Sequence, residues 1–235
     1  MKKLICLLLV FGLLLCLAAC GKAKNEGETI EVDPGAALAG GWAAAEDPAV
    51  TDERLALFDK AMAGLVGVDS TPLVYLGSQV VAGRNHAFLC QAQVVYPDAQ
   101  PYFAIVYIYE ALDGACEILS IAPIVANADG ISEAPQDPSA AVGAWTAPAE
   151  PDILIDMEED FAKATEGLVG VDYTPLCLLA TQVVAGVNYA VLCQARTVTP
   201  GAQPSYAVVS YYAALDGSCE LMNVSDFDFG AYCVY

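Results

Sequence analysis

The sequence predicts an α+β fold in which two tandem units each pack one helix on a curved antiparallel meander sheet. Three observations predict it. The sequence aligns with itself without a gap at an offset of 103 residues, the distance from Trp42 to Trp145. Each copy opens with apolar residues at helical spacing, and it continues with short runs rich in Val, Ile and Tyr that are separated by turn residues. A repeat of this length is typical of a duplicated domain and not of a solenoid.

The first residues have the pattern of an export signal. Two lysines precede an apolar run from Leu4 to Leu17, which is too short to span a bilayer comfortably. The tetrapeptide that ends in Cys20 resembles the lipobox of bacterial lipoproteins, in which the cysteine is acylated after cleavage. We therefore expect a signal peptide at 1–19, lipidation of Cys20, and a chain anchored to the cell membrane by lipid only, facing outside. Residues 20–39 are polar and acidic and are predicted to be a flexible spacer.

The charge balance excludes nucleic acid as a partner. The chain carries 9 Lys and Arg against 29 Asp and Glu. Loss of Lys2 and Lys3 with the signal leaves a net charge of −22 (7 − 29). Affinity for phosphate backbones needs clustered cations, which this sequence lacks. The acidity is instead typical of a surface that keeps an alanine-rich protein in solution.

Within each unit the hydrophobic period changes from helical to alternating. Residues 51–66 have apolar side chains at helical spacing, and the second copy repeats the pattern at Ile155, Phe161, Ala164 and Leu168. Strands are predicted at 73–81, 87–95, 102–109 and 117–124. These runs are apolar on both faces in places, so we expect the sheet to be strongly curved or covered. The predicted domains are 40–126 and 143–235, joined by an extended linker at 127–142 that contains Pro135 and Pro138.

A short motif occurs at the same place in both units. Gln79-Val80-Val81-Ala82-Gly83 and Gln182-Val183-Val184-Ala185-Gly186 are each followed by x-Asn and an aromatic or imidazole ring. They resemble the Gln-x-Val-x-Gly hairpin of cystatins, closest to the stefin type, and they follow a predicted helix as that hairpin does. The resemblance implies a cystatin-like fold over about 40–126 and 143–226. The alternative is that the motif is a compact hairpin that the fold favours and the duplication kept.

The resemblance also implies a function. Cystatins occlude the substrate cleft of papain-like cysteine proteases with two hairpins and a flexible glycine. By resemblance the two motifs would enter the cleft, and Gly40 or Gly41 and Gly143 would be the trunk glycines. The second hairpins would be Leu112-Asp113-Gly114 and Leu215-Asp216-Gly217. They lack the Pro-Trp pair of many cystatins, and Asp113 and Asp216 place charge where an apolar contact would help.

The sequence contains no recognisable set of catalytic residues. The single histidine, His86, corresponds to Tyr189 in the second copy, and there is no catalytic triad, phosphate-binding glycine loop or zinc-spaced Cys/His cluster. We expect no enzyme activity, no cofactor and no metal. Symmetry suggests disulfides Cys90–Cys116 and Cys193–Cys219, with Cys177–Cys233 remaining, but an intervening strand would keep each repeated pair too far apart. Buried free thiols are the alternative.

The leading hypothesis is a surface-anchored, double-headed inhibitor of papain-like proteases. A different class of function stays open, in which the duplicated units are a binding module without inhibitory activity that recognises an envelope or host component with avidity. Pairing of open sheet edges into a swapped dimer or fibril is a third possibility. Fold-level similarity alone does not decide among them.

Overall fold

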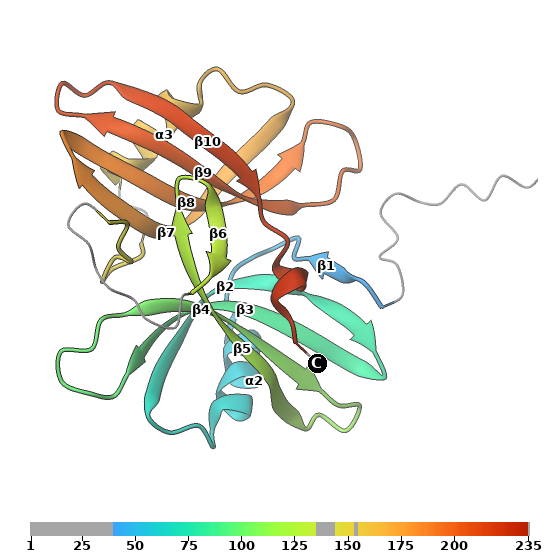
Figure 1. Ribbon diagram of the computed structural model, residues 1–235. Coiled ribbons are helices and arrows are strands. Elements are labelled where there is room, and N and C mark those ends of the chain that lie inside the picture. Colours follow the sequence, from blue (N-terminus) through green and yellow to red (C-terminus); the bar gives the residue numbers. More distant parts are fainter. Residues whose placement is uncertain (1–39, 135–143, 153–154, 235) are drawn as a thin grey trace, which may run out of the picture. The chain divides into compact units, whose positions relative to one another are not determined.

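The computed structural model describes residues 40–134, 144–152 and 155–234 (Figure 1). The predicted signal peptide, Cys20 and the spacer to residue 39 lie outside the described residues. So do Gly143 and residues 135–142 of the predicted linker. No helix in the described ranges combines the length and hydrophobicity needed to cross a membrane.

The first repeat forms one helix and a six-stranded antiparallel sheet. The strands follow one another in space as they do in sequence, in the order β1-β2-β3-β4-β5-β6. The elements are β1 (Trp42–Ala44), α2 (Asp52–Met62), β2 (Val68–Val81), β3 (Gly83–Val94), β4 (Tyr102–Glu110), β5 (Cys116–Asn127) and β6 (Gly130–Glu133). The sheet therefore continues into the segment predicted to be a linker.

In its described residues, the second repeat forms one α-helix and a four-stranded sheet of the same connectivity, in the order β10-β9-β8-β7. A single bridge between Thr146 and Thr181 stands where the first repeat has β1. The elements are α3 (Ile155–Thr165), β7 (Val171–Val184), β8 (Gly186–Thr197), β9 (Ser205–Ala214), β10 (Cys219–Asp226) and a short 3₁₀ helix η1 (Phe229–Tyr232).

The sequence explains where α2 begins and which face it buries. The Thr51 hydroxyl accepts a hydrogen bond from the Arg54 amide at 3.4 Å, and acidic residues occupy the first turn, where the helix dipole favours them. Phe58 is the buried residue of the helix, and its ring packs edge-on against Phe88 of β3 at 5.4 Å between centroids. The helix thus covers one face of the first sheet.

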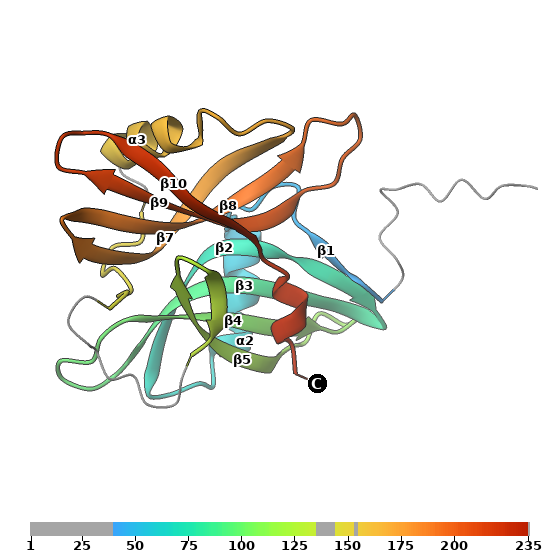
Figure 2. The same ribbon diagram turned by 45° about the horizontal axis from the view of Figure 1, so that its top comes forward.

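The opposite faces of the two sheets pack on each other. Alternate residues of β2, β3 and β4 join alternate residues of β7, β8 and β9 in one hydrophobic cluster. Its members include Leu76, Leu89, Ile105, Leu179, Leu192 and Val208, all at most 1% exposed. The helices cover the outer faces in two separate clusters. The layers are therefore helix, sheet, sheet and helix, and Figure 2 shows α3 on the outer side of the second sheet.

The predicted fold class is wrong. Strands make up 53% of the described residues and helices 13%, in two sheets with two α-helices among those residues. The chain is β-rich, and it is not two separate helix-on-sheet, cystatin-like domains. The physical reason lies in strands that are apolar on both faces. An 11-residue helix covers only one face of each sheet, so the other face is buried against the second repeat.

The contacts between the repeats are reciprocal. Gln91 of β3 donates to the Pro148 carbonyl at 2.9 Å, and its counterpart Gln194 of β8 donates to the Ala45 carbonyl at 2.8 Å. Such an exchange of equivalent contacts is the mark of two-fold symmetry. Each repeat also adds a distinct segment to the other. The Asn127 carbonyl, beside β6, accepts a hydrogen bond from Ser210 of β9, and the Phe229 carbonyl in η1 accepts one from the Tyr107 hydroxyl of β4.

Candidate functional site

The segments assigned to protease contact in the first repeat meet at one end of its sheet. The β2–β3 turn and the β4–β5 turn lie at the same end, because Arg84 of β3 pairs with Val80 and with Glu110. Gly40 reaches that end as well, since its carbonyl accepts a hydrogen bond from Gln79 Nε2 at 2.6 Å. Gly41, next to it, is half-buried. We call this end the tip surface of the repeat: the β2–β3 turn with Val80 to Gly83, and the β4–β5 turn with Leu112 to Gly114.

The second repeat has an equivalent tip surface. Its β7–β8 turn carries Val183 to Gly186, and its β9–β10 turn carries Leu215 to Gly217. The register pairs Gly186 with Ala214, which brings the two turns together. Gly143, the predicted trunk glycine, is outside the described residues, so a third segment is not placed here.

The glutamine of each motif serves the hairpin itself. Gln79 Oε1 accepts a hydrogen bond from Asn85 Nδ2 at 2.7 Å, and Gln182 Oε1 accepts one from Asn188 Nδ2 at the same distance. Gln79 is only 9% exposed, and both asparagines are buried. The glutamine and the asparagine therefore hold each hairpin together, and of these four side chains only that of Gln182 is partly exposed.

The glycine of each motif is required by close backbone approach. Gly83 has a φ of +133°, and a Cβ added there would lie 2.4 Å from the Glu110 carbonyl oxygen. Gly186 has a φ of +137°, with the Ala213 carbonyl at the same 2.4 Å. A tyrosine completes each turn, because Tyr109 donates to the Ala82 carbonyl and Tyr212 to the Ala185 carbonyl, both at 2.6 Å. The space leaves room for glycine alone.

The exposed surface of each tip is apolar and consists of side chains that lie between these structural positions. The exposed fractions are 59% and 40% for Val80 and Val81, and 90% for Leu112. The second tip surface repeats them with Val183 at 74%, Val184 at 46% and Leu215 at 89%. Each tip thus has one valine and one leucine that are more than half exposed and a second valine that is 40–46% exposed.

The aspartates beside the leucines have a local role. Asp113 Oδ1 accepts from the Ala115 amide and Asp216 Oδ1 from the Ser218 amide, each at 3.0 Å. Hydrogen bonds from Ser218 lower the pKa of the Asp216 carboxyl. A side chain that bonds the backbone two residues on is typical of tight turns. The negative charge at the tip is therefore part of the turn.

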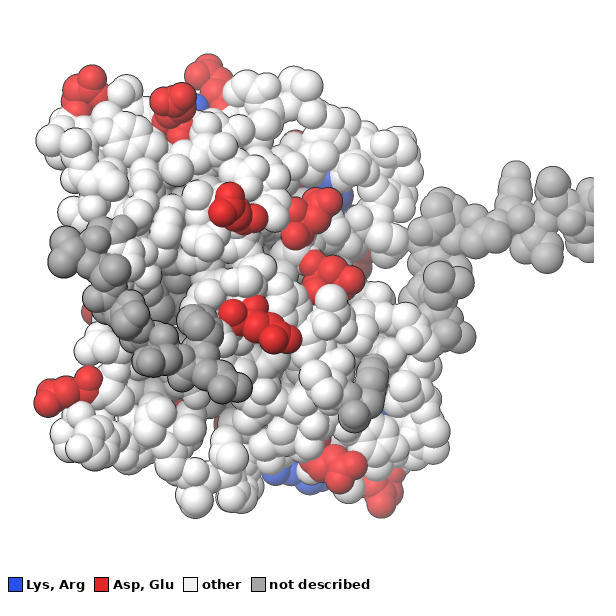
Figure 3. Space-filling view, viewed as in Figure 1, with Lys and Arg blue, Asp and Glu red and all other residues white. Residues whose placement is uncertain are grey.

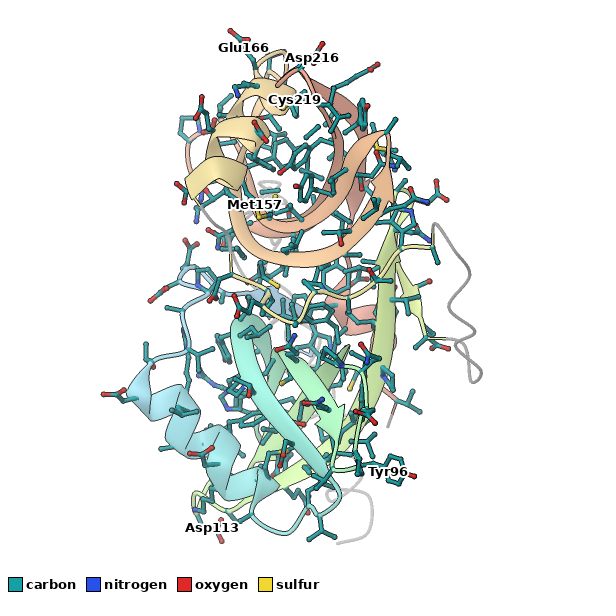
Figure 4. All side chains as sticks on the ribbon, turned by 90° about the vertical axis from the view of Figure 1, so that its left-hand side faces the viewer. Tyr96, Asp113, Met157, Glu166, Asp216 and Cys219 are labelled. Carbon is teal, nitrogen blue, oxygen red and sulfur yellow. The ribbon has the colours of Figure 1, made fainter. Side chains whose placement is uncertain are left out.

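The two tip surfaces point away from each other. Gln91 lies at the end of β3 that is far from the first tip, and it contacts Pro148 of the second repeat. The counterpart of Pro148 in the first repeat is Ala45, which bonds to Leu76, a residue closer to the tip than Gln91 is. The far end of one sheet therefore lies against a part of the other repeat that is closer to its tip. Because Gln194 makes the same contact in reverse, the sheets run head to tail. Figure 4 accordingly shows Asp113 and Asp216, the turn residues of the two tips, at opposite ends of the molecule.

No family model matches this chain. No curated protein matches it either.

The single histidine belongs to a hydrogen-bonded row. His86 Nδ1 lies 2.9 Å from the Tyr75 hydroxyl, and Nε2 lies 3.1 Å from Glu110 Oε2. Burial lowers the pKa of His86, and Glu110 partly opposes this effect. Within the described ranges, no group of three or more His, Cys, Asp or Glu side chains is placed to hold a metal ion.

The cysteines for which the repeat symmetry suggested disulfides are free thiols in the structure. Cys90, Cys116, Cys177, Cys193 and Cys219 are free. Cys90 pairs with Ala104 and Cys116 with Glu110, and these two partners are six positions apart along β4, which corresponds to roughly 20 Å. A disulfide needs Cα atoms within about 7 Å. Burial raises the pKa of the Cys177 thiol to about 12, so this buried group has little thiolate character.

Sequence reasoning did not single out one cluster of charged residues. Arg54, Lys60, Arg84 and Glu110 surround His86 in a groove beneath α2. The available signal was the difference between the repeats, since the second copy has Met157, Val187, Tyr189 and Ala213 in place of Arg54, Arg84, His86 and Glu110. On the face shown in Figure 3, by contrast, acidic residues are scattered and no broad basic patch occurs.

Proposed function

We propose that the protein is an exported, lipid-anchored binding protein with two heads, each of which occludes the substrate cleft of a papain-like cysteine protease with its tip surface. One observation carries the proposal. At each of two opposite ends, an exposed pair of valines and an exposed leucine project from adjacent rigid turns. The resemblance of the valine-containing motif to the cystatin hairpin supplies the class of target.

The turn chemistry suits an inhibitor that is not cleaved. Gly83 and the Tyr109 hydroxyl fix the backbone around Ala82, so the tip cannot extend along a protease cleft as a substrate does. Full burial of a valine or leucine side chain is worth roughly 1.5–3 kcal/mol. Three such side chains on a preorganised tip can supply useful affinity, because little conformational entropy is lost on binding.

The rest of the chain would supply location and valency. Acylation of Cys20 would hold the protein at the outer face of the membrane, and residues 20–39 would separate its heads from the lipid. Opposed tip surfaces would let two proteases bind one chain without competing for space. No catalytic step by the protein itself is part of this proposal.

The experiment is inhibition of papain by the chain from Gly21 onward, followed as hydrolysis of a fluorogenic peptide. The test variant carries Val80→Asp, Val81→Asp, Val183→Asp and Val184→Asp. Each aspartate would place a charge in the buried contact, so we expect inhibition to fall by at least about 100-fold. This choice leaves Gly83 and Gly186 intact, because changing them would distort the hairpins.

The matched control uses valines at the other end of the same sheet. Val94 and Val95 are 47% and 63% exposed, and changing both to aspartate adds charge without touching a tip surface. We expect this control to inhibit as the wild type does. Equal loss of inhibition in control and test variants, or no inhibition of papain and related proteases by the wild type, would contradict the proposal. The second result would favour a binding module of another kind.

A further inference from the structure

The first repeat also contains a groove that none of the exposed side chains of the tip surface lines. It lies between α2 and the outer face of the first sheet, and its volume is about 610 Å³. Residues of α2, β2, β3 and β4 and of the β4–β5 turn line it. Figure 4 shows α2 along this side of the sheet, with Asp113 of the turn beyond its end.

The groove gathers positive charge in a strongly acidic protein. The described residues contain five Lys and Arg, and three of them, Arg54, Lys60 and Arg84, line the groove. Two carboxylates, Glu53 and Glu110, line it as well. With His86 neutral, one positive charge is unmatched (3 − 2). A chain of net charge −20 has few cations to place, so their gathering at one groove points to an anionic ligand.

The polar groups of the groove are held in fixed positions. The Arg54 guanidinium lies 4.0 Å above the Tyr75 ring, and one of its nitrogens donates to the Asp47 carbonyl at 2.8 Å and the Ala49 carbonyl at 2.5 Å. Lys60 donates to the Gly114 carbonyl at 2.6 Å. Among the described residues no hydrogen bond or ion pair is found for the Arg84 side chain. Arg84 is therefore the cation most available to a ligand.

The row of Tyr75, His86 and Glu110 gives the groove a defined floor. A neutral His86 that donates from Nε2 to Glu110 accepts the Tyr75 hydroxyl proton at Nδ1. His86 is 7% exposed, and Tyr75 is 6% exposed. Both rings are thus fixed by packing and by hydrogen bonds. A ligand in the groove would lie against groups that are already in place.

The second repeat shows what the fold alone would put here. In the same space Met157, Phe161, Leu178 and Tyr211 form a closed apolar cluster, with Tyr189 stacked on Tyr211 at 5.0 Å. Met157, Leu178 and Tyr189 are the counterparts of Arg54, Tyr75 and His86. Apolar packing therefore suffices to attach the helix to its sheet. The charged residues of the first repeat are therefore not needed to attach the helix to the sheet.

We propose that this groove binds a small monocarboxylate with a short apolar body. The single unmatched positive charge suits a monoanion better than a phosphate, which carries about two negative charges. The guanidinium of Arg84 matches a carboxylate in geometry. Ala56 and Leu57 line the groove and would contact the apolar body. The proposal is independent of protease binding, because the groove and the exposed side chains of the tips are different residues.

The test uses His86 as the reporter, since the chain has one histidine. The chain from Gly21 onward, labelled with ¹⁵N and ¹³C, is titrated with benzoate and with hexanoate, and the imidazole signals are followed by NMR. We expect a saturable shift with a Kd of about 1 mM or tighter. Benzamide, which has the shape of benzoate without its charge, should produce no saturable shift. Inorganic phosphate should bind more weakly than benzoate.

Two variants exchange residues between the repeats. Arg84→Val installs the second repeat's residue in the groove and should weaken benzoate binding by at least about tenfold, the value of a charge-assisted hydrogen bond. Arg196→Gln installs the first repeat's residue outside the groove and should leave the Kd within about twofold. Absence of a saturable shift with both acids, an equal shift with benzamide, tighter binding of phosphate, or an unchanged Kd in Arg84→Val would overturn the proposal.

Discussion

The shared core between the sheets predicts that the two repeats unfold together. Leu76 of β2 is fully buried in the cluster between the sheets. Replacing it with alanine removes buried methyl groups and leaves a cavity, at a cost of about 2–5 kcal/mol. With a slope of about 3 kcal/mol/M in urea, the unfolding midpoint should fall by roughly 1 M. If the repeats share one core, the second repeat should lose the same stability.

The two tryptophans make this measurable, because Trp42 lies in the first repeat and Trp145 in the second. Each is observed alone, by fluorescence, after replacement of the other with phenylalanine. We expect Leu76→Ala to shift the midpoints reported by Trp42 and by Trp145 equally. Val66→Ala, at a position 89% exposed, should change the free energy of unfolding reported by either tryptophan by no more than about 0.5 kcal/mol. A Trp145 midpoint that stays at its wild-type value in Leu76→Ala would refute the shared core.

Three further predictions concern single residues. Gly83→Ala should destabilise the protein by about 1–3 kcal/mol in urea unfolding, because its Cβ meets the Glu110 carbonyl, whereas Gly114→Ala, at positive φ in open space, should cost about 1 kcal/mol. Equal costs would contradict the close approach. Burial lowers the pKa of His86 below 6.5 in the folded state. The charges of Arg54 and Arg84 lower this pKa further, and Glu110 partly opposes the shift. The unfolded chain therefore takes up this proton first, so stability should decline as pH falls below about 6.5, and His86→Tyr should lessen that decline. NMR titration of His86 and unfolding at several pH values check this, and a His86 pKa above 6.5 would exclude it. Finally, Cys90 should react with a thiol reagent only on unfolding, because burial raises its pKa; fast labelling of the folded chain, read by mass spectrometry, would disprove it.

The order of helix and strands could be predicted because each has a local cause. Residues 51–66 were predicted to be helical, and the helix occupies Asp52–Met62; the strand predicted at 102–109 occupies Tyr102–Glu110. Apolar periodicity and glycine-containing turns specify such elements within a few residues. The strand at 73–81 was predicted too short, since β2 begins at Val68. Asp69 and Ser70 are polar and do not continue the apolar pattern, yet they pair with Gln93 and Ala92 of β3.

The packing of the repeats could not be predicted from one sequence. Val74, Tyr75 and Leu76 are consecutive and all buried, which indicates a sheet covered on both faces. Yet the sequence does not say which element covers which face. The structure puts Tyr75 under α2 and its two neighbours against the second sheet. Strand β6 was missed because residues 127–142 were predicted to be a linker, whereas β6 pairs with β5 across a tight turn and also contacts distant β9.

The sequence predicted where the two tip turns lie, but it did not predict what each residue of the turns does. The repeated motif located both tip turns, because an identical string at equivalent positions stands out in a single sequence. The sequence did not separate Gln79 and Gly83, which serve the hairpin, from Val80 and Val81, which are exposed. That distinction depends on Asn85 and on the Glu110 carbonyl, which only the folded register brings close.

The most direct test of the central claim is the stoichiometry of the complex with papain. The chain from Gly21 onward is mixed with excess catalytically inactivated papain, and the mass of the complex is measured by light scattering after size exclusion. Opposed tip surfaces predict two papain molecules per chain, falling to one in Val80→Asp/Val81→Asp and to one in Val183→Asp/Val184→Asp. A chain that elutes without papain, or a pair of variants that each still bind two, would contradict the account.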